Sequence, residues 1–438
     1  MGQRETTGAH ADGTAVVGAT TEFEQDVMDL LVETLRRAVR CELSVVGTDT
    51  LLGELVLGDT DAGEAIAPGM RKAGSLSGLI TGHAGRGWVS DDEVRGAHGA
   101  DGADEEARQQ PQQQDQQQDH READEKTVDA TWREACWRFG LGSRRSAPGS
   151  DQALPGMTGA LRACLLLAIG KARAEGTISV RCRHVARALV DLPDSRAREA
   201  LLLERLDLAA AATALDALDA SAAAETEGPE SRGVTLLRRC GTLGKSGNRL
   251  TRAFASWTSG STVNGSPVVF AVTNEAVRQA VRCGRAAVEP VDLLLGILAL
   301  DRALSVAGRS LPASLADANA APALLRRHGV RQVSLVSSAS ETQPAALPDS
   351  DGDGDGVWLS AAADRIMAVA RLSAAEHGSP TVGTVHLLSA LLDEPVTDVA
   401  GDAGDTAAGV GGAVVRLLAA DQVDLAALRA ELSSRLGA

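Results

Sequence analysis

The chain has 438 residues, enough for roughly two to four compact units. Apolar residues make up 44% of it, but there are only 5 Trp and 4 Phe and no Tyr, so we expect aliphatic cores between closely packed helices. The net charge of −16 argues against nucleic acid as the main partner, because binding to phosphates needs a basic surface. No apolar run approaches the roughly 20 residues that a membrane span requires, and the polar N-terminus is not typical of a secretory signal. We therefore expect a cytoplasmic protein with no membrane partner.

One pattern of residues occurs four times along the chain. A first capping position is followed by small residues at helical spacing, a helix-ending position, a valine, and apolar residues at the spacing of a second helix. The copies begin at Glu24, Thr158, Ser266 and Ser360, and their valines are Val46, Val180, Val288 and Val382. The helix-ending positions are Glu42, Gly176, Gly284 and Gly378, and glycine there favours a left-handed end. The pattern predicts four pairs of amphipathic helices, because an internal repeat decides the architecture.

In chain order, these copies divide the sequence into repeats and connecting segments. Residues 1–20 form a polar tail that we expect to be disordered, and the Gln-rich residues 81–127 are predicted to be a solvated linker. Within repeat 2, the stretch 132–139 predicts an extra helical turn packed on that repeat. The predicted boundaries are repeat 1 at 21–80, repeat 2 at 128–222, a linker at 223–265, repeat 3 at 266–338, an acidic Gly/Asp linker at 339–356 and repeat 4 at 357–438.

The fourth copy has the clearest second helix. Thr384 is expected to be its N-cap, and Leu387, Leu388 and Leu391 are expected to include buried core residues. His386 has no paired nucleophile or acid nearby, so we interpret it as a helix-start residue rather than a catalytic one.

These residues resemble the Clp amino-terminal repeat, which lies ahead of the ATPase modules in Clp-type unfoldases. The closest match is Val382-Gly383-Thr384-Val385-His386-Leu387-Leu388, followed by Val46-Gly47-Thr48-Asp49-Thr50-Leu51-Leu52, and the resemblance covers about two-thirds of the chain. It implies an all-α fold of tandem helical repeats. In this family two repeats form one domain, so we expect two pseudo-twofold double-repeat domains, with copies paired as one–two and three–four.

The resemblance also implies candidate peptide-binding residues, at the first caps and at the start of the second helices. They are Thr48, Asp49, Thr158, Ser266, Ser360 and Thr384. In some family members each repeat binds a phosphorylated arginine through a Glu that follows the second-helix Thr. The residues at that Glu position here are Asp49, Arg183, Val291 and Val385. Because only Asp49 is an acid that can pair with a guanidinium, we expect no specific binding of phosphoarginine.

Other motifs are incomplete. The sequence Gly244-Lys245-Ser246 suggests a phosphate loop, but Arg239 stands where its first glycine is required. The acidic run 351–356 imitates a calcium loop, but Ala362 stands where a bidentate Glu belongs. Six scattered cysteines are interpreted as reduced thiols. We therefore expect no cofactor, no metal and no enzymatic activity.

The leading hypothesis is a protein- or peptide-binding module that acts as adaptor, decoy or regulator of Clp-dependent proteolysis. Its partners would be Clp subunits, adaptors or clients. The alternative is a structural helical-repeat scaffold unrelated to Clp clients, and a divergent hydrolase is the third reading.

Overall fold

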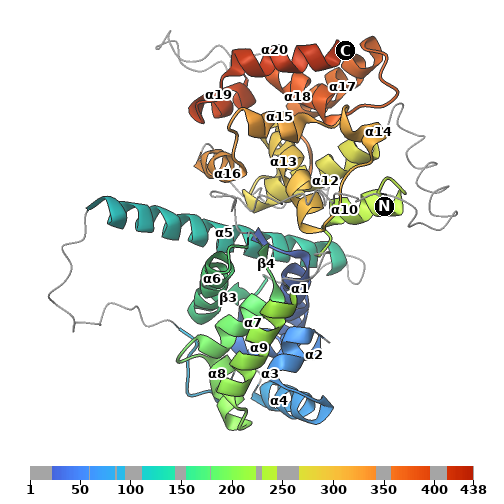
Figure 1. Ribbon diagram of the computed structural model, residues 1–438. Helices are drawn as coiled ribbons and strands as arrows, with labels where there is room; N and C mark the ends of the chain where they lie inside the picture. Colours follow the sequence, from blue (N-terminus) through green and yellow to red (C-terminus); the bar gives the residue numbers. More distant parts are fainter. Residues whose placement is uncertain are drawn as a thin grey trace, which may run out of the picture.

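The computed structural model describes residues 22–58, 60–83, 86–93, 111–143, 154–177, 179–222, 229–243, 266–341, 357–394 and 412–437. This part of the chain is mostly helical, and its strands are only two residues long (Figure 1). The all-α prediction is confirmed. Within these ranges no helix is both long enough and apolar enough to cross a membrane.

The elements fall into two groups along the chain. The first group is β1 (Glu22–Phe23), α1 (Gln25–Arg40), β2 (Val45–Val46), α2 (Thr48–Leu57), α3 (Asp61–Ile66), α4 (Met70–His83), α5 (Pro111–Ser143), β3 (Gly156–Met157), α6 (Gly159–Ala174), β4 (Ser179–Val180), α7 (Cys182–Asp191), α8 (Arg196–Leu203) and α9 (Leu208–Ala222). The second group is α10 (Arg232–Arg239), α12 (Pro267–Arg282), β5 (Ala287–Val288), α13 (Pro290–Val306), α14 (Ala313–Ala316), α15 (Ala321–Arg327), α16 (Gln332–Glu341), β6 (Trp358–Leu359), α17 (Ala361–Glu376), α18 (Thr384–Leu392), α19 (Ala413–Ala420) and α20 (Leu425–Leu436).

The repeated pattern has a regular structural counterpart. The first helix of each copy, α1, α6, α12 or α17, is 16 residues long. Thr158, Ser266 and Ser360 cap three of these helices by accepting a hydrogen bond from a first-turn N–H. Their N-cap counterpart in copy one, Glu24, makes no such side-chain bond. The valine that follows each first helix is buried in all four copies.

The turn after each first helix requires a left-handed backbone. Gly176, Gly284 and Gly378 have φ angles of 74°, 73° and 64°. Glu42 holds the same place in copy one and has a φ of 53°, a conformation that costs energy for any residue with a Cβ. The expected left-handed helix ends are confirmed, and copy one reaches the same turn under strain.

The copies meet through short parallel strands. In the first group, β1 pairs with β4 through Phe23 and Val180, and β2 pairs with β3 through Val46 and Met157. These two pairs are reciprocal, since each copy contributes one strand before its first helix and one after it. In the second group, β5 pairs with β6 through Val288 and Leu359.

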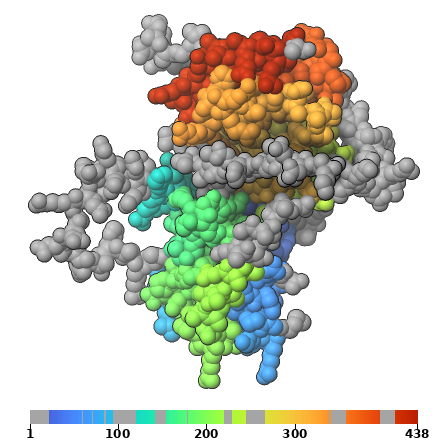
Figure 2. All heavy atoms as spheres, in the orientation of Figure 1, coloured from blue at the N-terminus to red at the C-terminus, as the bar shows by residue number. Residues whose placement is uncertain are grey.

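The apolar side chains form two separate cores. One contains buried residues between Phe23 and Leu215, and the other contains buried residues between Val234 and Leu432. We call the described residues of 22–222 the first unit and those of 229–437 the second unit. Figures 1 and 2 show the second unit, yellow to red, stacked on the first, blue to green. Leu387, Leu388 and Leu391 are all buried in the second core, as predicted.

Two of the predicted connecting segments contain packed helices. Residues 81–127 were expected to be a linker, but α5 begins at Pro111 and continues through 132–139, which is part of this long helix rather than an extra turn. Val128, Ala135 and Phe139 anchor α5 in the first core, and Gln is a good helix former, so the helix extends back into the Gln-rich sequence. In 223–265, α10 packs against α12 and buries Val234 in the second core. The acidic run 351–356 and the Gly244-Lys245-Ser246 sequence lie outside the described residues.

Candidate functional site

The strand pairs bring the start of one copy's second helix against its partner copy. In the first unit, the β2–β3 pair places the N-terminus of α2 beside Thr158, the cap of α6, and α8 packs against α2. The N–H groups at a helix start have no partner within the helix, so they need an acceptor from elsewhere. We call the group Thr48, Asp49, Asp92, Thr158 and Arg196 the α2–α8 site.

Asp92 fills this site with its carboxylate. It accepts hydrogen bonds from the backbone N–H and the hydroxyl of Thr48, both at 2.7 Å, and from the hydroxyl of Thr158 at 2.8 Å. A fourth bond, at 3.0 Å, comes from the backbone N–H of Arg196 at the first position of α8. The Asp92 side chain is completely buried. One carboxylate therefore satisfies two helix N-termini and two hydroxyl groups, where the positive ends of the helix dipoles favour a negative charge.

Asp49 lies beside these groups but is not satisfied in the same way. Its side chain is 1% exposed, and neither carboxylate oxygen has a hydrogen-bond partner in the described part of the protein. The nearest cation is the guanidinium of Arg196, whose Nη1 is 4.0 Å from Oδ1. Burial raises the pKa of Asp49, the charge of Asp92 raises it further, and Arg196 opposes both.

The other three junctions are also closed by residues of the chain itself. At α7, the backbone N–H of Cys182 donates to Asp26 at 3.0 Å. At α18, the N–H of Thr384 donates to the side chain of Asn319 at 3.1 Å. At α13, Pro290 occupies the first helical position and has no N–H to satisfy.

The predicted site residues therefore separate into groups. Thr48, Asp49 and Thr158 are brought together, whereas Ser266 and Ser360 cap α12 and α17 in the second unit. The expectation that Thr384 is an N-cap is wrong, because Gly383 is the N-cap and Thr384 is the first helical residue.

His386 explains why the cap lies one residue earlier. Its Nδ1 accepts the backbone N–H of Gly383 at 3.0 Å, which ties that residue to the helix start. His184 makes the same contact with the N–H of Arg181, at 2.9 Å. His386 is thus a helix-start residue, as interpreted from the sequence, and His184 has the same role at the start of α7.

Comparisons with known proteins add no relative. No family model, curated protein or solved structure matches the chain.

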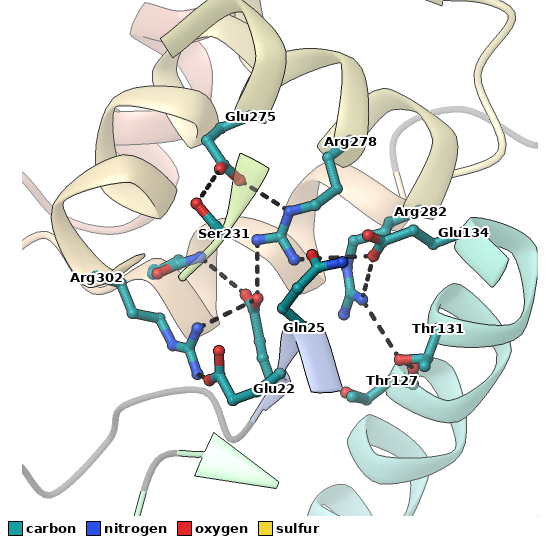
Figure 3. A network of polar contacts seen from close by, with 12 residues as sticks. Glu22, Gln25, Thr127, Thr131, Glu134, Ser231, Glu275, Arg278, Arg282 and Arg302 are labelled. Atoms are coloured by element: carbon teal, nitrogen blue, oxygen red, sulfur yellow. Dashed lines mark hydrogen bonds and ion pairs between the residues drawn. The ribbon is translucent and has the colours of Figure 1, made fainter. Parts of the chain in front are cut away.

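A second polar cluster joins the two units and was not predicted. We call it the inter-unit ion network; its residues are Glu22, Glu24, Glu134, Arg278, Arg282 and Arg302. Figure 3 labels all of them except Glu24. Arg278 reaches Glu22 at 2.9 Å, and Arg302 reaches Glu24 at 2.6 Å. Arg282 reaches Glu134 of α5 at 3.2 Å.

The network is buried and charged. Burial raises the pKa of Glu22, but the charges of Arg278, Arg302 and Arg282 outweigh it, so the pKa lies well below its ordinary value. Burial lowers the pKa of Arg278, but Glu22, Glu275 and Glu134 raise it well above its ordinary value. Both partners are therefore ionised. Removing one member of a buried pair leaves the other charge without that partner, so separating the two units at this network would be costly.

Sequence reasoning missed Asp92 and Arg196 because neither follows the repeated pattern. Asp92 comes from the segment predicted to be a linker, and only its contact with residues far along the chain reveals it. Within the described ranges no group of three potential metal ligands occurs. In the α2–α8 site a carboxylate is held at two helix N-termini, and in the inter-unit ion network carboxylates are held by arginines.

Proposed function

We propose that the chain consists of two double-repeat domains of the Clp amino-terminal type and acts as a protein- or peptide-binding module. The observation that carries the proposal is the reciprocal pairing of β1 with β4 and of β2 with β3, which joins two equal helical segments into one unit with a single core. A domain built from two repeats is what the family resemblance implies.

The proposed role is that of an adaptor, decoy or regulator of Clp-dependent proteolysis, with no catalytic activity of its own. Its partners would be Clp subunits, adaptors or clients. Large apolar side chains on the surface of the second unit support contact with proteins, and Phe270, Trp358 and Leu372 are each more than half exposed. Aromatic residues of this kind are enriched in protein interfaces.

Phosphoarginine is not part of the proposal. The closed junctions support this, since Asp92 and Asp26 already accept the N–H groups that a phosphate would need. Copies three and four also have Val291 and Val385 where an acid would hold a guanidinium.

Co-purification of the full chain from cells, with identification of the bound proteins, tests the proposed role. Enrichment of Clp subunits, adaptors or known clients over a chain with Trp358→Ser and Leu372→Ser would support it. Enrichment of unrelated proteins only would favour the alternative, a structural helical-repeat scaffold. That alternative has one observation behind it, the inter-unit ion network, because fixed units suit a scaffold.

A further inference from the structure

The carboxylate in the α2–α8 site comes from a segment outside the repeated pattern. We call residues 86–93 the strap. It crosses from the end of α4 to the start of α8, and Asp92 is its only buried residue. Three further hydrogen bonds hold its main chain. The N–H groups of Val89 and Ser90 donate to Glu199 at 2.9 and 3.0 Å, and the carbonyl oxygen of Asp92 accepts the N–H of Ala160 in α6 at 2.8 Å.

Apolar packing of the strap comes mainly from one side chain, Trp88, which is partly buried against the first core and stacks on His83 with the ring centroids 4.4 Å apart. Val89 is 95% exposed, and the guanidinium of Arg196 reaches the strap through the carbonyl oxygens of Ser90 and Asp91, at 3.4 and 2.9 Å. Asp92 itself has a φ of 62°, in the left-handed region that is costly for residues with a Cβ. A short segment that is held by one buried residue, one partly buried Trp and a few hydrogen bonds is among the first parts of a fold to open.

The site under the strap is complete without it. Its four donors come from α2, from the cap of α6 and from the start of α8, and none of them belongs to the strap. These elements belong to the first core or to its caps, so we expect them to stay in place when the strap leaves. The four donors therefore form a carboxylate-binding site, and Asp92 of the same chain occupies it.

A second observation points to a ligand other than the strap. Asp49 is buried beside the site, with the Arg196 guanidinium 4.0 Å away, and neither of its oxygens accepts a hydrogen bond in the described part of the chain, so the strap leaves the hydrogen-bonding capacity of this carboxylate unused. An unsatisfied buried acceptor is costly. A segment that supplies both a carboxylate for the four donors and an N–H or O–H for Asp49 would satisfy more of the site than the strap does.

We propose that the α2–α8 site is a binding site for acidic peptide segments and that the strap is an internal ligand that closes it. An acidic segment of a partner protein takes the place of Asp92 when the strap is released. The inference rests on the proposed protein-binding function, of which it names one site and one class of ligand. It does not depend on Clp proteins as the partners.

The test uses the full chain and a fluorescent peptide with the sequence of residues 86–93, followed by anisotropy. In the Asp92→Ala chain the strap has lost its carboxylate and the four donors remain, so we expect this chain to bind the peptide at least ten times more tightly than the wild type. A peptide with Ala in place of Asp92 should not bind. Asp91→Ala, an exposed neighbour, is the matched control and should behave like the wild type.

A second variant covers the case in which Asp92→Ala weakens the fold. Glu199→Gln loosens the main-chain anchors of the strap but leaves the four donors intact. We expect faster hydrogen exchange in residues 86–93 and peptide binding between that of the wild type and that of Asp92→Ala. Equal binding by all chains, or equal binding of the acidic and the Ala peptide, would overturn the proposal. Displacement of the peptide by an equal concentration of inorganic phosphate would also overturn it, because the site would then bind free anions. None of these results bears on co-purification with Clp proteins.

Discussion

Leu388 of α18 offers a direct measure of how the second unit is held together. Its side chain is completely buried in the second core, and the same position of the repeat in copy two is Ala186, which is also completely buried. This position of the repeat thus accommodates either Leu or Ala, provided that the surrounding side chains fill the remaining space. Replacing Leu388 by Ala leaves a space that the copy-four neighbours do not fill.

The size of the effect follows from the burial. The change removes three carbon atoms from a fully buried side chain, which at about 0.8 kcal/mol per buried methylene is roughly 2.4 kcal/mol of lost transfer free energy. The cavity adds to this, because a packed core relaxes only partly, and the usual range is about 2–5 kcal/mol. We expect Leu388→Ala to lower the free energy of unfolding by about 3–4 kcal/mol.

Urea unfolding followed by hydrogen exchange checks this prediction and locates the loss. Because the two cores share no residues, protection should fall in the helices of the second unit and remain in α1 and α6 of the first. The matched control is Leu372→Ala on α17, where the side chain is 64% exposed and the cost should stay below about 0.5 kcal/mol. A loss of that small size at Leu388 would refute the assignment of this residue to the core.

Three further predictions concern a turn, a charge and a ligand. Glu42→Gly should raise the free energy of unfolding by about 1 kcal/mol, because glycine adopts the left-handed backbone of this turn without strain. Gly176→Ala, at the same turn of copy two, should lower the free energy of unfolding by about as much. Thermal unfolding measures both variants, and no gain in stability from Glu42→Gly would contradict the inferred backbone strain at Glu42. Glu22→Gln should cost about 3 kcal/mol at pH 7, because it removes the buried carboxylate that pairs with both Arg278 and Arg302. Because the folded chain lowers the pKa of Glu22, the cost is fully present above the ordinary value of 4.5 and shrinks as the pH falls toward the lower folded pKa, so urea midpoints of the two chains should converge at low pH; a constant difference would argue against the charge. Isothermal calorimetry of the full chain with phosphoarginine should show no saturable binding, and saturable micromolar binding would contradict this prediction.

The features that the sequence predicted well are local ones. Gly176, Gly284 and Gly378 mark the helix ends because a left-handed turn depends on the residue itself. Thr158 and Ser360 mark helix starts for a similar reason, since each bonds an N–H only a few residues away. Such features depend on the residue itself and on its neighbours in the chain, so the local sequence is enough to predict them.

The features that were missed depend on distant partners. The composition of 111–127 is polar, and nothing in it shows that Val128 and Phe139 further along will pack in the first core and carry the helix backward. Glu22 likewise reads as an ordinary acid at the start of a repeat, until Arg278, far away in the sequence, is placed 2.9 Å from it.

The candidate site combines both kinds of feature. Thr48 and Thr158 were identified because they fit the repeated pattern, and the structure brings their hydroxyl groups to the same carboxylate. That carboxylate, Asp92, belongs to no pattern, yet it decides whether the site is open. Asp49 is the acid at the Glu position of the repeat, but its presence alone does not predict ligand binding while the strap is in place. If Asp92 is displaced, the same donors become available together, because two helix starts and a cap already face one point. Binding at this junction thus depends on the equilibrium of the strap, which only Asp92 and Glu199 variants can separate from the chemistry of the site.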